Sequence, residues 1–281
     1  MLYRKINQKI RSQYVMEGAG VRLKRVFGFY EKNTFDPFLL LDNFGSDDPY
    51  DYLAGFPWHP HRGIETVTYM LSGSVEHGDS MGNKGTINSG DVQWMTAGSG
   101  IIHQEMPKRF EGRMQGFQLW VNLPASHKMM PPRYQDVPAS SILQTSPADG
   151  VKIKVIAGDI NGVSGPVKDI VMSPRYYDIH LAAGKSFEIE VDPKHTVICF
   201  VYEGSVVFEE NTDKVINAGE LAQLTDGNKV WMEASDMDAK LLFISGMPLN
   251  EKVAWRGPIV MNTEEELNQA FLEYRNGTFI K

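Results

Sequence analysis

Residues 56–70 read FPWHPHRGIETVTYM, and this stretch begins the part of the chain that decides the fold. His59 and His61 are two positions apart, and residues two apart on a β-strand point to the same face. The residues that follow are rich in β-branched and aromatic side chains, which favours a second strand from Thr66 to Leu71. The stretch therefore predicts two strands, the first of which presents two imidazoles into one cavity.

A second segment, residues 98–106 with the sequence GSGIIHQEM, repeats this spacing with His103 and Glu105. Two such strands lying side by side would bring together three neutral imidazoles and one carboxylate. This ligand set suits Fe(II), Mn(II), Ni(II), Cu(II) or Zn(II), and the absence of thiolates argues against a structural zinc site. Four protein ligands on a six-coordinate ion leave two positions open, enough for a bidentate substrate or for a substrate and O2.

Glu65 is the alternative carboxylate, since it follows His61 by four residues in a pattern common at metal sites on barrel strands. Arg62-Gly63 indicates a bend between the two, so Glu65 could instead pair with a cation. We favour Glu105 as the fourth ligand and keep Glu65 as a residue beside the site that could replace it.

The pattern of short strands and turns predicts the fold class. Between Thr66 and Asn122, strands alternate with turn sequences such as Ser72-Gly73 and Ser89-Gly90, a spacing typical of a β-sandwich or barrel. The proline-rich segment 124–146 lacks periodicity and is interpreted as a crossover between two domains. Thr263 to Glu266 form a capping box that predicts a helix over about 263–276.

An internal repeat indicates two copies of one β fold. YMLSGSV at residues 69–75 aligns with FVYEGSV at 200–206, and INSGD at 87–91 aligns with INAGE at 216–220. Counting from these anchors, the second copy has Glu190, Asp192, Met232 and Ala234 where the first has its histidines and Glu105. The repeat therefore predicts a metal site in the first copy only.

Composition excludes several classes of protein. The 281 residues are 42% hydrophobic and 22% charged, with a formal net charge of -7, which offers no general basic field for nucleic acid. The single cysteine, Cys199, excludes an intramolecular disulfide framework. No run of eighteen apolar residues exists, so we expect a soluble, cytoplasmic protein without a membrane segment.

Long motifs carry a family resemblance. HPHRGIETV at residues 59–67 and GDVQWMTAGSGIIHQE at 90–105 resemble the pirin family of the cupin superfamily. DPFLLLDNF at 36–44, QLWVNLP at 118–124 and the closing segment 262–277 are also similar to pirins. The resemblance covers nearly the whole chain.

The resemblance implies an all-β bicupin, with two face-to-face cupin β-barrels of the jelly-roll type and a short C-terminal α-helix. Its terminal segments would be exchanged between the barrels. We expect an N-terminal metal-binding barrel over residues 1–135 and a metal-free C-terminal barrel over 136–281 that carries the terminal helix.

The same resemblance implies a site and an activity. One metal, usually iron, would be bound through His59, His61, His103 and Glu105, which supports Glu105 over Glu65. Several pirins are similar to quercetin 2,3-dioxygenases, so we expect a metal-dependent dioxygenase that uses O2 on a flavonol, a small planar aromatic.

In that reaction, coordination would lower the pKa of the substrate hydroxyl, with Glu105 as base and Glu65 or His77 as further candidates. The alternative is an iron-dependent redox-sensing regulator that binds a protein partner without turnover. We expect a monomer that does not bind nucleic acid directly.

Overall fold

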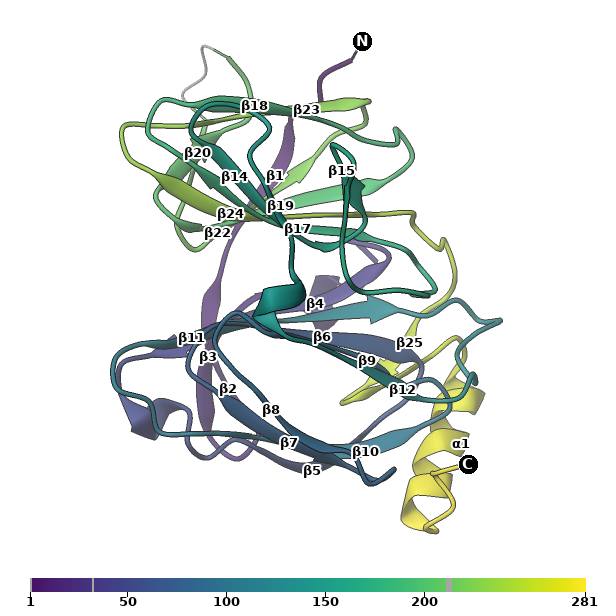
Figure 1. The fold of residues 1–281 in the computed structure, drawn as a ribbon. Coiled ribbons are helices and arrows are strands. Elements are labelled where there is room, and N and C mark those ends of the chain that lie inside the picture. The colour runs from purple at the N-terminus through teal and green to yellow at the C-terminus, as the bar shows by residue number, and fades with distance from the viewer. Residues whose placement is uncertain (1, 32, 211–213) are drawn as a thin grey trace. The chain divides into compact units, whose positions relative to one another are not determined.

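A computed structural model of the protein describes residues 2–31, 33–210 and 214–281. Within this range the chain forms strands, short 3-10 helices and one α-helix, α1 (Glu264–Arg275). It divides into two compact units. The N-terminal barrel comprises Gln13–Ala139 with Leu249–Lys281, and the C-terminal barrel comprises Met1–Ser12 with Ser140–Pro248 (Figure 1).

The N-terminal barrel has a larger sheet in the order β12-β9-β6-β11-β4-β3-β2, a smaller sheet in the order β5-β10-β7-β8, and a β25-β26 hairpin. Its strands are β2 (Gln13–Glu17), β3 (Val21–Phe27), β4 (Phe38–Ser46), β5 (Phe56–His61), β6 (Ile64–Ser72), β7 (Val75–Asp79), β8 (Lys84–Ile87), β9 (Val92–Thr96), β10 (Ile101–Pro107), β11 (Met114–Asn122), β12 (Arg133–Val137), β25 (Ala254–Arg256) and β26 (Ile259–Met261). The 3-10 helices η1 (Phe29–Glu31) and η2 (Pro49–Asp51) lie in its connections.

The C-terminal barrel has a larger sheet in the order β1-β22-β19-β24-β17-β14-β13, a smaller sheet in the order β18-β23-β20-β21, and a β15-β16 hairpin. Its strands are β1 (Ile6–Arg11), β13 (Gln144–Thr145), β14 (Val151–Ala157), β15 (Asp159–Ile160), β16 (Val163–Ser164), β17 (Arg175–Leu181), β18 (Ser186–Glu190), β19 (Thr196–Glu203), β20 (Ser205–Val207), β21 (Val215–Asn217), β22 (Glu220–Leu224), β23 (Lys229–Ala234) and β24 (Ala239–Gly246). The 3-10 helix η3 (Ala139–Ser141) lies where the chain passes between the units.

The two sheet orders confirm the internal repeat. The run β9-β6-β11-β4-β3 has its counterpart in β22-β19-β24-β17-β14, and β5-β10-β7-β8 has its counterpart in β18-β23-β20-β21. Gly73 and Gly204 follow equivalent strands with φ of 92° and 69°, a left-handed conformation that glycine adopts without steric cost. The aligned glycines of the sequence repeat therefore mark equivalent turns.

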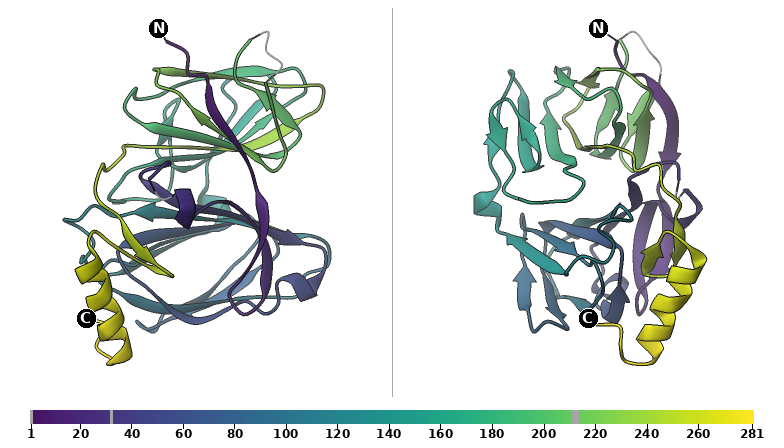
Figure 2. Two further views of the ribbon diagram at one scale, coloured as in Figure 1. Left: turned by 180° about the vertical axis from the view of Figure 1, so that it is seen from behind. Right: turned by 90° about the vertical axis from the view of Figure 1, so that its right-hand side faces the viewer.

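The structure assigns the ends of the chain differently from the predicted ranges 1–135 and 136–281. Strand β1 pairs with β22 of the C-terminal barrel, while α1 packs against β25 and β26 of the N-terminal barrel (Figures 1 and 2). Contiguous ranges could not show this, because antiparallel pairing joins strands that are far apart in sequence. The exchange of terminal segments that the resemblance implied is confirmed.

The terminal helix matches its sequence signature. Thr263 accepts a hydrogen bond from the Glu266 amide, and the Glu266 side chain accepts one from the Thr263 amide, so the capping box is formed. Leu267 and Ala270 of the predicted apolar stripe are buried. The membrane criterion gives a negative result for α1: neither it nor any other described helix combines enough length with enough apolar character to cross a bilayer.

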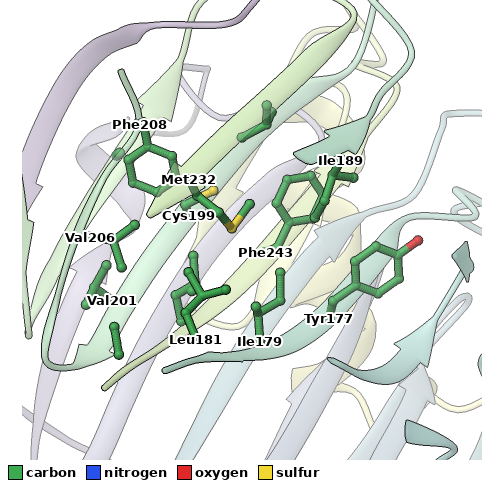
Figure 3. Close-up of a cluster of buried hydrophobic side chains, with 14 of the residues drawn as sticks. Tyr177, Ile179, Leu181, Ile189, Cys199, Val201, Val206, Phe208, Met232 and Phe243 are labelled. Carbon is green, nitrogen blue, oxygen red and sulfur yellow. The ribbon is translucent and has the colours of Figure 1, made fainter. Parts of the chain in front are cut away.

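The interior of the C-terminal barrel is filled with apolar side chains, as Figure 3 shows around Cys199, Met232 and Phe243. In the β18–β23 ladder, Phe187 lies opposite Met232 and Ile189 lies opposite Val230. The residues facing this interior are therefore Phe187 and Ile189, whereas Glu190 and Asp192, found by counting along the sequence, are exposed. Counting failed because the loop from Val191 to His195 is longer than the matching turn at Arg62-Gly63.

Candidate metal centre

The two histidine segments form neighbouring strands of the smaller sheet in the N-terminal barrel. Strand β5 pairs with β10 in antiparallel register, with His59 opposite His103 and His61 opposite Ile101. The spacing of two along β5 directs His59 and His61 to one face. The prediction that two strands lie side by side and bring three imidazoles together is confirmed.

The three imidazoles meet through one ring nitrogen each. The Nε2 atoms of His59 and His61 are 3.1 Å apart, and those of His59 and His103 are 3.0 Å apart. One candidate ligand atom from each of the three side chains lies within 4.8 Å of the other two. The cluster is thus compact enough for one ion to contact all three rings.

The opposite ring nitrogens fix the tautomers of two histidines. Nδ1 of His59 is 2.8 Å from the Pro57 carbonyl, and Nδ1 of His61 is 3.0 Å from the Pro258 carbonyl. A carbonyl only accepts hydrogen bonds, so in each neutral ring Nδ1 carries the proton and Nε2 carries a lone pair. Two lone pairs 3.1 Å apart repel each other unless a cation lies between them.

Burial keeps these rings in the ligand form. Desolvation lowers the pKa of His59, and it lowers the pKa values of His61 and His103 well below the ordinary value of 6.5, helped by mutual repulsion among the rings. All three are therefore neutral at pH 7. Neutral imidazole is the form that binds metals.

The nitrogen spacing fits a divalent transition metal. Two imidazole nitrogens, each about 2.1 Å from one ion and at right angles to each other, would be roughly 3.0 Å apart. The observed separations of 3.0 and 3.1 Å agree with adjacent positions around a six-coordinate ion. A tetrahedral angle at the same bond length would place the nitrogens about 3.4 Å apart, so the cluster favours the six-coordinate arrangement.

Glu105 lies two residues beyond His103, where the β5–β10 register shifts. Its Oε1 accepts a hydrogen bond of 3.1 Å from Thr68 on β6, in the larger sheet. Burial raises the pKa of Glu105 to about 7, against the hydrogen bond from Thr68, which lowers it. Glu105 shares a cavity wall with His59 and His61 but stands outside the compact histidine cluster.

The prediction for Glu65 is corrected. Glu65 and Thr68 are three positions apart on a strand of regular register, so their side chains point to opposite faces of the sheet. Thr68 faces Glu105, whereas Glu65 accepts a hydrogen bond of 2.7 Å from Thr96. The spacing from His61 was misleading because the Gly63 turn carries the chain from the smaller sheet to the larger one.

A cavity of about 590 Å³ opens beside the histidines, and its wall is mostly apolar. Of the aromatic residues near the predicted strands, Phe56, Trp58 and Trp120 line it. The Trp120 ring lies edge-on to His61, with centroids 5.1 Å apart. Trp94 and Met95 belong to the buried core instead. This volume is typical of a site for a small organic ligand.

Two further residues near the site carry no signal in the sequence. Tyr134 lies on β12, inside the segment interpreted as a crossover, and its hydroxyl is 3.5 Å from Nδ1 of His103. His77, considered only as a reserve base, lies opposite Glu105 in the β7–β10 ladder and stacks on Tyr134. Both depend on pairings between strands that local sequence does not reveal.

The C-terminal segment also takes part in the site. Pro258, in the turn between β25 and β26, supplies the carbonyl that orients His61, and Trp255 lines the cavity. Both belong to Leu249–Lys281, which packs with the N-terminal barrel. The exchanged segment therefore completes the surroundings of the histidine cluster.

Comparison with known proteins places the chain in a family. Residues 20–121 match the Pirin family model, and residues 176–280 match the model of the Pirin C-terminal cupin domain. A pirin-like protein of Caulobacter vibrioides is 45% identical over 99% of this chain and 100% of its own. Human pirin is 39% identical over 97% of this chain and 93% of its own.

Solved structures give the same result. The crystal structure of a quercetin 2,3-dioxygenase from Acinetobacter baumannii is similar with a TM-score of 0.92 and 34% identity, covering 99% of both chains. Identity of this extent over nearly the whole length shows common descent of both barrels. The chain belongs to the pirin family and is an all-β bicupin with a C-terminal helix.

Proposed function

We propose that this pirin is a metal-dependent dioxygenase that oxidises a flavonol with O2. The observation that carries the proposal is the convergence of three neutral imidazoles, two of them with lone pairs facing each other, on the wall of a mostly apolar cavity. Such a cluster is stable with a cation in it, and the cavity beside it is sized for a small aromatic molecule. The similarity to a protein named quercetin 2,3-dioxygenase supports the flavonol class.

The residues that would hold the metal are His59, His61, His103 and Glu105, and iron is the metal we propose. When bound there, the ion would act as a Lewis acid toward the hydroxyl and carbonyl oxygens of the substrate. The geometric fit to six coordination leaves room for such a chelating substrate.

The protein side chains would position the substrate and accept its proton. The planar rings would lie along Trp120 and Trp255, whose centroids are 5.8 Å apart on the cavity wall. Glu105 is the base we propose: Thr68 donates to Oε1, which leaves Oε2 to accept the hydroxyl proton. Glu65 is not proposed for this role, because it faces the opposite side of its sheet.

The test is oxygen uptake by protein reconstituted with iron under anaerobic conditions, measured with and without quercetin. We expect uptake that requires quercetin and is lost in the double variant His59→Ala/His61→Ala. His180→Ala, which changes a histidine of the C-terminal barrel, is the matched control and should retain the rate. Fully metal-loaded protein that consumes no oxygen with quercetin would contradict the proposal and favour a regulatory pirin without turnover.

A further inference from the structure

A row of polar side chains crosses the inner face of the larger sheet in the N-terminal barrel. Its members lie opposite one another on successive strands, and directly opposite residues share a face. The row consists of Asp136 on β12, Gln93 on β9, Thr68 on β6, Gln118 on β11, Asp42 on β4 and Arg25 on β3. It is the polar part of a barrel interior that also contains Met95, Ile64 and Leu40.

One part of this row faces the cavity. Thr68, Gln118, Asp42 and Arg25 line it, whereas Gln93 is buried and donates to Asp136 at 2.8 Å. Thr68 hydrogen-bonds to Glu105 at one end of the lining part. The polar wall therefore begins at a proposed metal ligand and leads away from it toward Arg25.

Asp42 is held rigidly but retains the capacity to bind a ligand. Arg25 donates from Nε to Oδ1 and from Nη2 to Oδ2, both at 2.9 Å, in a bidentate pair. A carboxylate offers about four acceptor sites, so Arg25 occupies roughly half of them. The Asp42 carboxylate can therefore accept a further hydrogen bond from a hydroxyl group in the cavity.

Gln118 supplies a second polar group beside Asp42. One end of its amide meets the Thr68 hydroxyl at 2.8 Å, and the other end has no hydrogen-bond partner among the described residues. A polar group left without a partner in a desolvated site costs free energy. The unpartnered end of Gln118 therefore favours a ligand that carries hydrogen-bonding groups.

The local charges distinguish between classes of ligand. Arg25 also donates to Glu17 at 2.6 Å, so one guanidinium is surrounded by two carboxylates on this side of the cavity. The excess of negative charge disfavours carboxylates and sulfates and favours neutral hydroxyl donors. Arg22, at the same wall, is already paired with Asp51 at 3.6 Å.

The distance along the row fits a molecule of several fused or linked rings. Thr68 and Asp42 are separated by two strand spacings, or roughly 10 Å. A planar aromatic that approaches the metal site with one end would place groups at its far end near Asp42.

We propose that Asp42, positioned by Arg25, and Gln118 form a subsite for phenolic hydroxyl groups at the end of the substrate remote from the metal. The substrate class is then a neutral, polyhydroxylated planar aromatic. This inference rests on the proposed function and names the feature of the flavonol that the cavity selects.

The test compares two flavonols that share the chelating 3-hydroxyl and 4-carbonyl groups. Quercetin has further hydroxyls on both of its outer rings, and 3-hydroxyflavone has none. Their Kd values for the metal-loaded protein without oxygen can be measured from quenching of tryptophan fluorescence, since Trp120 and Trp255 line the cavity. We expect quercetin to bind wild-type protein about tenfold more tightly, the effect of one hydrogen bond to a charged group.

Variants then assign that preference to the subsite. Gln118→Leu and Asp42→Asn should bring the ratio of the two Kd values close to one, mainly by weakening quercetin binding. Gln93→Leu changes the same residue type in the same row, outside the cavity, and should keep the tenfold ratio. Gln118→Leu leaves the Arg25–Asp42 pair intact, so it decides the question if Asp42→Asn does not fold.

The outcomes separate the subsite from the proposed function. Equal binding of the two flavonols to wild-type protein, or an unchanged ratio in Gln118→Leu, would overturn the subsite alone. Binding of neither flavonol, together with the absence of oxygen uptake, would overturn both.

Discussion

At the scale of single residues, the histidine cluster is organised by what lies behind each ring. His59 and His61 donate from Nδ1 to main-chain carbonyls, which no side-chain substitution removes. His103 depends on a side chain, because its Nδ1 faces the Tyr134 hydroxyl at 3.5 Å. Burial raises the pKa of Tyr134 well above its ordinary value, so the phenol stays neutral and can accept this hydrogen bond.

Tyr134→Phe should therefore weaken metal binding. Loss of a hydrogen-bond partner behind a metal-binding histidine typically lowers metal affinity by about 10–100-fold. Competition with a chromogenic chelator measures the change, and Tyr50→Phe, at an exposed tyrosine of the same barrel, is the control. An unchanged Kd for the metal would show that Tyr134 does not orient His103.

The pH dependence of metal binding tests Glu105. Because the pKa of Glu105 is about 7 in the folded protein, its carboxyl is protonated at pH 6 and must lose that proton to bind a metal. Metal affinity should therefore rise with pH up to about 7 and then level off, with proton release at pH 6. Calorimetry in buffers of different ionisation enthalpy measures the released protons. The same proton release in Glu105→Gln would contradict its assignment as a ligand.

At the scale of elements, the exchanged C-terminal segment is fastened beside the site by Arg62, the residue after His61. The Arg62 guanidinium donates to the Ser99 and Phe279 carbonyls and pairs with Glu273 of α1 at 2.8 Å. Its side chain is 2% exposed. The pair joins the end of β5 to the helix and the tail, so it also fixes the segment that carries Pro258.

Glu273→Ala should leave the buried Arg62 without its carboxylate. Removing one partner of a buried ion pair costs about 3–5 kcal/mol, and the partial exposure of Glu273 puts our expectation near the lower end of that range. Urea unfolding measures the loss. Glu76→Ala breaks an exposed ion pair with Lys108 in the same barrel and should cost at most about 1 kcal/mol. Equal effects of the two changes would refute the anchoring role.

The sequence predicts these elements where the signal is local. Strand parity identified His59, His61 and His103, and the capping box identified α1. The sequence alone did not identify Tyr134 or Pro258, because each reaches the site through pairing or packing with residues distant in the chain. The Glu65 prediction failed for a related reason: spacing along the chain does not show where a turn moves it to another sheet.

At the scale of the whole molecule, one β fold occurs twice with different interiors. The N-terminal barrel holds a cavity beside three histidines, whereas apolar side chains such as Phe187, Ile189 and Met232 fill the C-terminal barrel. A filled interior is close-packed and stabilises the fold without offering ligands. We therefore expect the second barrel to contribute stability and the first to contribute the chemistry.

Met232→Ala tests this division. Met232 is fully buried, so its truncation should lower the free energy of unfolding by about 2–5 kcal/mol through lost burial and a residual cavity. Metal content should stay the same as in the wild type. Urea unfolding and metal analysis of the folded variant measure both quantities, and loss of bound metal would contradict the division of roles.

The most direct test of the account is the number of metal ions bound per chain. Protein reconstituted with Fe(II) under anaerobic conditions and freed of excess metal should contain one ion per chain by elemental analysis. The folded His59→Ala/His61→Ala variant should contain none, and His180→Ala should again contain one. Metal retained by the double variant, or folded wild-type protein that binds no metal, would contradict the claim that this cluster is the metal centre.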